Sequence, residues 1–169
     1  DEPPQIDYRE VIAHAKAGHS CITTGPFLQV RTADGKGPGE TISSKEPILL
    51  HVRVQCNTWT DIDRVVVLVN GRIDPKLDLR RSDHPGLFSK ETVRFEQDLT
   101  VPLSADAHLI LVPIVEAMKL ETGYGRSWQK DLHPIAYHNP IYVDTDGNGF
   151  QSSGDTLGHP FLGLQQKEE

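Results

Sequence analysis

The stretch that decides the fold is Arg64-Val65-Val66-Val67-Leu68-Val69-Asn70-Gly71. Its run of β-branched side chains is typical of a packed β-strand, because branched residues fit well on a pleated surface. The Asn-Gly pair that follows is the strongest short signal for a tight β-hairpin turn. The segment therefore predicts a strand that ends in a hairpin.

Strand patterns also lie on both sides of this segment. Apolar and polar residues alternate from Leu28 to Thr32, from Leu50 to Val54 and from Val93 to Leu103, which is the period of a half-buried strand. The apolar run from His108 to Val115 predicts a core strand buried on both faces. A final strand is expected from Ile135 to Val143.

Six or seven short strands with Gly- and Pro-bearing connections indicate a mainly β fold. We expect an antiparallel sandwich, immunoglobulin-like or fibronectin type III-like, over residues 20–150. The segment from Asp74 to Lys90 has the weakest pattern within it. Residues 151–169 are expected to form an extended C-terminal tail.

The composition fits one globular domain and narrows the possible partners. The chain has 169 residues and a net charge of −7, which argues against nucleic acid because phosphate binding depends on Lys and Arg. The longest apolar run, Leu109 to Val115, is interrupted by Pro113. It is far too short to cross a bilayer, so no membrane span is expected.

A short helix is expected before the strands. Asp7 is a suitable N-cap, and Gly18 supplies a left-handed stop. Val11, Ile12 and Ala15 form a narrow apolar stripe between them. Because so short a helix is not stable alone, the stripe must dock on a surface. That surface is either the β-domain or a missing upstream domain, in which case residues 1–19 are the remnant of its last helix.

The explicit chemistry lies in Asp144-Thr145-Asp146-Gly147-Asn148-Gly149-Phe150-Gln151-Ser152-Ser153-Gly154-Asp155. The spacing fits a twelve-residue calcium loop, since Ca²⁺ takes many hard oxygen ligands and the sixth-position glycine lets the chain wrap around the ion. The predicted ligands are Asp144, Asp146, Asn148, the Phe150 carbonyl, Ser152 and Asp155.

The loop also departs from the calcium template. Gln151 occupies a position that is usually aliphatic, and Asp155 replaces a longer glutamate. Asp-Gly and Asn-Gly also form plain turns, so calcium and a bare turn both remain open. A lone loop of this kind would bind Ca²⁺ at about 0.1–1 mM. That affinity suits an extracellular or periplasmic compartment.

The remaining reactive side chains form no enzyme motif. The eight histidines include no His-x-His and no His-Glu-x-x-His, which are familiar metal-binding spacings. His133 and His138 are expected to be satisfied structural histidines. Cys21 and Cys56 are expected to be small buried hydrophobes, and a disulfide between them stays open. We therefore expect no catalytic and no cofactor-binding residues in this chain.

Aromatic residues could line a sugar-binding face or be buried in the sandwich: Trp59, Tyr124, Trp128 and Tyr137.

Several short segments, in this order, resemble one family. They are Ala17-Gly18-His19-Ser20, Thr23-Thr24-Gly25-Pro26-Phe27-Leu28, Asp34-Gly35 followed by Gly37-Pro38-Gly39-Glu40, Val67-Leu68-Val69-Asn70-Gly71-Arg72 and Asn139-Pro140-Ile141-Tyr142-Val143-Asp144. They are similar to the point where the catalytic domain of CehA/McbA-type PHP (polymerase and histidinol phosphatase) metallohydrolases meets a C-terminal all-β region.

The resemblance implies a function in two parts. This chain would be a non-catalytic accessory domain that packs on and stabilises a catalytic barrel in cis, absent from this chain. The parent protein would be a metal-dependent hydrolase of phosphate, carbamate or similar esters. The alternative is a free-standing calcium-stabilised sandwich module that binds a protein or glycan partner.

Overall fold

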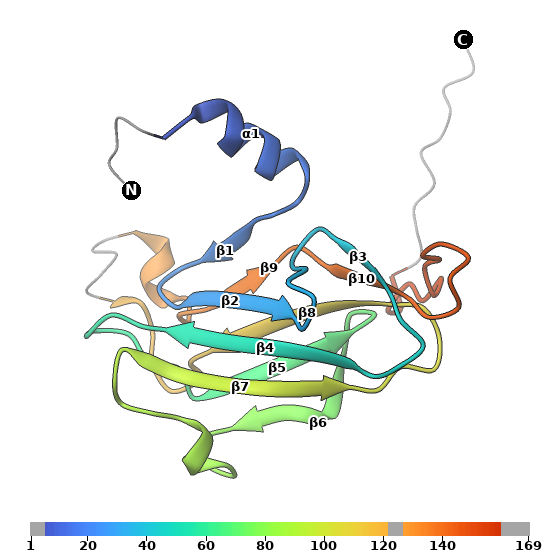
Figure 1. The fold of residues 1–169 in the computed structure, drawn as a ribbon. Helices are drawn as coiled ribbons and strands as arrows, with labels where there is room; N and C mark the ends of the chain where they lie inside the picture. The colour runs from blue at the N-terminus through green and yellow to red at the C-terminus, as the bar shows by residue number, and fades with distance from the viewer. Residues whose placement is uncertain (1–5, 122–126, 160–169) are drawn as a thin grey trace.

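A computed structural model describes residues 6–121 and 127–159 (Figure 1). The protein is mainly β, with antiparallel sheets and a short helix near the N-terminus, as the sequence predicted. The described elements are, in chain order, α1 (Tyr8–Lys16), β1 (Cys21–Thr23), β2 (Phe27–Thr32), β3 (Thr41–Ser43), β4 (Ile48–Gln55), β5 (Arg64–Val69), β6 (Arg72–Arg80), the 3-10 helix η2 (Pro85–Leu87), β7 (Val93–Val101), β8 (Ala107–Ile114), the 3-10 helix η4 (Trp128–Asp131), β9 (Ala136–His138) and β10 (Ile141–Asp144).

Two sheets face each other as a β-sandwich (Figure 1). One has the order β2-β4-β7, and the other has the order β3-β10-β8-β5-β6. All of their pairings are antiparallel except the parallel pair of β3 and β10. The neighbours β10, β8 and β5 are the three inner strands of the larger sheet.

The core lies between these sheets and follows the period-two pattern. Leu50, Val52 and Val54 of β4 are at most 1% exposed, whereas His51 and Arg53 between them face solvent. The opposite sheet contributes fully buried side chains from β5, β8 and β10: Val65, Val67, Leu109, Leu111, Ile141 and Val143. Burial of these apolar side chains is the main force that holds the two layers together.

The deciding segment folds as predicted. β5 pairs with β6 across a two-residue turn, with Val69 opposite Arg72. Asn70 and Gly71 have φ values of 51° and 78°, which are the left-handed positions that such a hairpin turn requires.

The expectation of little structure from Asp74 to Lys90 is wrong for its first part. β6 continues to Arg80. It is an edge strand of its sheet, where a proline such as Pro75 is tolerated because one side of the strand needs no ladder bonds. Leu77 and Leu79 are its buried side chains, so its hydrophobic pattern is weak.

Two other strand expectations also need correction. The structure contains more strands than the six or seven predicted, partly because Ile135–Val143 divides into β9 and β10 around Asn139-Pro140. β8 is not buried on both faces, because its buried residues alternate with half-buried ones. Its continuous apolar run hides this alternation, since the outer face is covered only partly.

The remaining expectations concern the ends of the chain and the cysteines. Residues 151–159 are exposed and form no helix or strand, while 160–169 and 1–5 lie outside the described residues. Both cysteines are free; Cys56 is buried as expected, but Cys21 is exposed. Among the described residues, no helix has the length and apolar character needed to cross a membrane.

Candidate metal site and the helix junction

The loop after β10 folds around the carboxylate of Asp144. This residue ends β10 and is only 3% exposed. One carboxylate oxygen accepts the Gly147 N–H at 2.7 Å, and the other accepts the Gly149 N–H at 3.1 Å. Both glycines have positive φ values, 82° and 99°, which lets the chain curl back on itself. The loop is therefore a tight turn closed on a buried acid.

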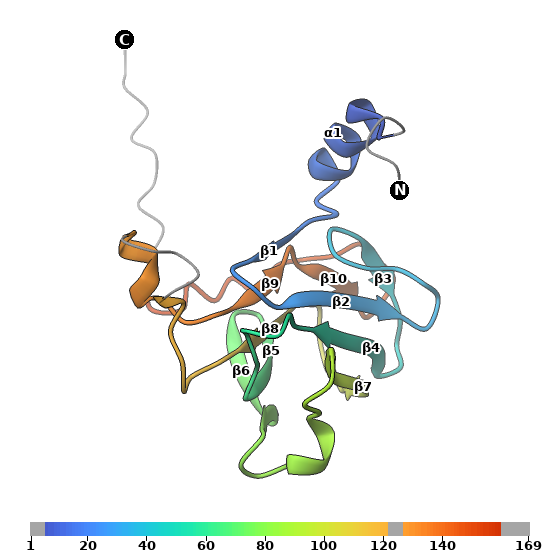
Figure 2. The ribbon, with the colours of Figure 1, turned by 90° about the vertical axis from the view of Figure 1, so that its left-hand side faces the viewer.

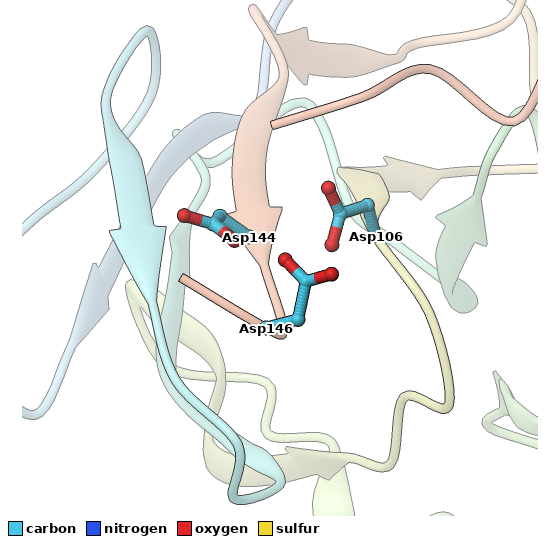
Figure 3. Close-up of side chains that lie close together, drawn as sticks. All are labelled: Asp106, Asp144 and Asp146. Carbon is cyan, nitrogen blue, oxygen red and sulfur yellow. The ribbon is translucent and has the colours of Figure 1, made fainter. Parts of the chain in front are cut away.

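Two further carboxylates converge on the same place. Oxygen atoms of Asp106, Asp144 and Asp146 all lie within 4.8 Å of one another, and Figure 3 shows the three side chains together. Asp106 comes from the connection before β8. Because Ala107 of β8 is paired with Val143 of β10, the register sets Asp106 beside Asp144.

Backbone amides hold Asp106 and Asp144 in their charged form. Asp106 accepts the N–H groups of Thr145 and Gln151, each at 2.8 Å, and these bonds lower its pKa. Burial opposes ionisation of Asp144, but the bonds from Gly147, Gly149 and Ser43 outweigh it and lower its pKa as well. The cluster therefore carries concentrated negative charge at neutral pH, which a hard cation would neutralise.

The predicted ligands divide between this cluster and other positions. Asn148 lies beside the cluster, because its backbone N–H and its side-chain amide donate to Asp146 at 3.1 and 2.7 Å. The ring of Phe150 packs edge-on against Tyr142, with centroids 5.0 Å apart, and Ser152 is exposed. Asp155 forms a two-pronged ion pair with Arg72 at 2.5 and 2.9 Å. The calcium ligand set stays a prediction, but the structure gives Asp155 another partner and adds Asp106.

The end of α1 is held firmly by two other loops. The Asn139 side chain donates to the Gly18 carbonyl at 3.0 Å and to the Ser20 hydroxyl at 2.8 Å. Gly39, with φ +84°, lies so close that a Cβ atom would be 2.4 Å from the Ala17 carbonyl oxygen. The Gly39 N–H is bonded in turn to the Pro140 carbonyl at 2.9 Å. We call this contact of residues 17–20, 37–40 and 139–140 the helix junction.

The body of α1, in contrast, packs on nothing in the described chain. Asp7 caps it as predicted, accepting the Arg9 N–H at 2.9 Å. No residue of Tyr8–Lys16 is buried, and Val11 and Ile12 are 55% and 47% exposed. Figure 2 shows the helix standing away from the sandwich, joined to it through the chain that enters β1.

The two histidines singled out from the sequence have structural partners. His138 is buried; its Nε2 accepts the Leu111 N–H at 3.1 Å, and its Nδ1 donates to the Asn139 carbonyl at 2.6 Å. Burial lowers its pKa, so the ring is neutral at neutral pH. His133 Nδ1 lies 2.8 Å from the Met118 carbonyl. Both are satisfied histidines, as expected.

Comparison with protein-family models, with curated proteins and with solved structures gave no match. The resemblance to the PHP-type metallohydrolases therefore stays a prediction from the quoted sequence segments.

Proposed function

We propose that this chain is the non-catalytic accessory domain of a PHP-type metal-dependent hydrolase, docked on the catalytic domain through α1. The observation that carries the proposal is the contrast within α1. Its end is fixed at the helix junction, while its capped body has no buried residue. An isolated nine-residue helix is marginal in water, so a partner surface is needed to stabilise it.

The composition of the helix junction supports the same proposal. Three of the segments that carry the family resemblance, Ala17–Ser20, Gly37–Glu40 and Asn139–Asp144, are far apart in the sequence but supply the contacts of the junction. A fixed attachment of the helix to the sandwich gives a physical reason for their occurrence together. Such an attachment is useful when the helix belongs to a second body whose position must be set.

The surface around the helix suits an apolar partner. Ile6 and Val11 are more than half exposed and, with Ala15, line an open hollow of about 530 Å³ beside the junction. Ile22 of β1 and Phe27 of β2 are also more than half exposed. Burial of such side chains yields about 1.5–3 kcal/mol for each one fully covered. We propose that the catalytic domain in cis covers them.

We further propose that the loop after β10 binds Ca²⁺ in a structural role. Asp144, Asp146 and Asn148 would supply ligands, with the Phe150 carbonyl and Ser152 completing the loop. Asp106 supports the proposal most strongly, because it brings a third carboxylate to the site that the linear motif lacked. It would take the role first assigned to Asp155, whose carboxylate is paired with Arg72. Ca²⁺ suits this set because it prefers many oxygen ligands in flexible geometry.

The accessory proposal is tested by the activity of the purified chain. With added manganese, zinc or iron, it should not hydrolyse generic phosphodiesters or aryl esters. Metal-dependent turnover that survives repurification and disappears in His133→Ala or His138→Ala would contradict the proposal, since it would assign catalysis to the sandwich itself.

A free-standing module that binds a glycan is the second candidate, favoured by exposed tryptophans. Trp59 and Trp128 are 51% and 74% exposed, contrary to burial in the sandwich. Trp59 borders a hollow of about 480 Å³ that Glu116, Lys119 and His133 also line. Tyr124 lies outside the described residues, and Tyr137 is 39% exposed. Glycan binding by the isolated chain that is lost in Trp59→Ala would favour this candidate.

A further inference from the structure

Two histidines at the helix junction face each other. His14 lies in the last turn of α1, and His19 follows the glycine that ends the helix. Their Nδ1 atoms are 3.1 Å apart, and their ring planes are inclined by 43°. Both side chains are exposed, so solutes can reach the space beside them.

The separation of these two nitrogens fits chelation of one metal ion. Zinc binds imidazole nitrogen at 2.0–2.1 Å, so two nitrogens on one zinc at angles of about 90° to 109° lie about 2.9–3.4 Å apart. The observed 3.1 Å falls within this range. As a plain hydrogen bond, the same contact would need one Nδ1 to donate and the other to accept.

The backbone fixes the two histidines relative to each other. The His19 N–H donates to the His14 carbonyl at 2.9 Å, and Gly18 makes the left-handed turn between them with φ +78°. Asn139 holds the Gly18 carbonyl from the other side. This turn fixes the two backbone positions, so only the two side chains need to be ordered on binding.

The surroundings can complete a coordination sphere. Asp7 and Glu10 line the same hollow as His14 and His19. Glu10 precedes His14 by one helical turn, and side chains at that spacing are neighbours on a helix surface. After rotation of its side chain, the Glu10 carboxylate, together with water, would add to the two imidazoles. Imidazole ligands favour zinc, copper and nickel, whereas Ca²⁺ takes oxygen ligands.

We propose that His14 and His19 form a binding site for a divalent transition-metal ion of the zinc class. The metal bonds to both Nδ1 atoms, and each ring then carries its proton on Nε2. It links the last turn of α1 to the segment that enters β1, and so fixes the direction of the helix. The inference rests on none of the observations of the calcium loop, and its site borders the hollow that the accessory proposal assigns to the partner surface.

Calorimetric titration of the full chain with zinc chloride near neutral pH tests this site. We expect one zinc ion per chain at this position, with affinity reduced at least about tenfold in His14→Ala and in His19→Ala, since even loss of supporting groups costs about 10–100-fold. Both side chains are exposed, so the variants should fold. His84→Ala, which removes another exposed histidine, is the matched control and should bind like the native chain.

Two further measurements separate this site from the acidic loop and from a hydrogen-bonded pair. Asp146→Asn should retain zinc binding, and zinc should shift the Nδ1 resonances of His14 and His19 in ¹⁵N spectra of the histidine rings. Unchanged zinc affinity in both His14→Ala and His19→Ala, or resonances that do not move at saturating zinc, would overturn the proposal.

Discussion

Gly39 has a left-handed backbone conformation and also lies very close to the end of α1. Mutation can separate the energetic cost of backbone strain from the cost of this close contact. Gly35 has the same φ of +84° but nothing within 4 Å of a Cβ position, whereas at Gly39 a Cβ would meet the Ala17 carbonyl oxygen at 2.4 Å. Gly35→Ala should cost about 1–2 kcal/mol of unfolding free energy through backbone strain alone. Gly39→Ala should cost about 1–3 kcal/mol more, because backbone must move.

Urea denaturation of both variants measures this difference. Equal losses of unfolding free energy in the two variants would show that the helix junction is not tightly packed at Gly39.

His138 gives the protein a specific dependence on pH. Burial lowers its pKa in the folded state from the ordinary value of 6.5. Below pH 6.5, the unfolded chain therefore binds the proton more readily than the folded chain does. Stability from this group is therefore present above about pH 6.5 and is lost as the pH falls toward the folded pKa. His138→Gln keeps an acceptor for the Leu111 N–H but cannot titrate.

We expect thermal unfolding between pH 5 and 7 to depend more steeply on pH in the native chain than in His138→Gln. The carboxylates with lowered pKa values titrate below this window. Parallel pH profiles of the two proteins would contradict the assignment of His138 as a buried neutral ring.

Individual residues could be predicted from the sequence where the contact is local. Asp7 as the helix cap follows from spacing along the chain, and the structure confirms it. The proximity of Asp144 and Asp146 also follows from their spacing, and their carboxylates lie close together. Asp106 could not be found in this way. Its place beside Asp144 depends on the register of β8 and β10, which becomes known only when the strands are paired.

The loop after β10 is the element whose proposed ligand can be tested most simply. Calcium at several millimolar should raise the melting temperature of the native chain, since a ligand that binds only the folded state stabilises it by mass action. The rise should disappear in Asp146→Asn and Asp106→Asn but persist in Asp155→Asn, whose carboxylate pairs with Arg72. Magnesium should substitute poorly, because it requires a smaller octahedral site.

Differential scanning calorimetry of these variants with and without calcium distinguishes the possible outcomes. Loss of the rise in Asp155→Asn together with its retention in Asp106→Asn would indicate a purely linear loop. No heat and no shift in the native chain would leave the segment as a turn held by its own backbone amides.

A strand could be predicted from the sequence when one of its faces is buried and the other is polar, because its apolar and polar residues then alternate. β4 alternates cleanly and could be placed from sequence, because its solvent face is polar. β8 was misjudged as doubly buried, since its half-covered outer face is also apolar. β6 was missed because few of its side chains are buried. Apolar residues therefore do not alternate with polar ones along most of this edge strand.

At the level of the whole chain, the sandwich and the helix differ in how they are held. The sandwich is closed by a continuous core that includes residues from both sheets. Within residues 6–121 and 127–159, the helix is attached through its last residues, and its apolar side chains are exposed. The fold class could be predicted because alternating strands and turn residues are local properties. The partner of the helix could not, because no residue of α1 is buried by the described part of the chain.

Amide hydrogen exchange of α1 tests the central claim most directly. In a monomer of this chain, residues Tyr8–Lys16 should exchange far faster than the amides of β7 that pair with β4. In a polypeptide that also contains the native upstream region, the same residues should become strongly protected. Protection of α1 as deep as that of β7 in the monomer, or no gain of protection with the upstream region, would contradict the proposal that α1 docks on a catalytic domain.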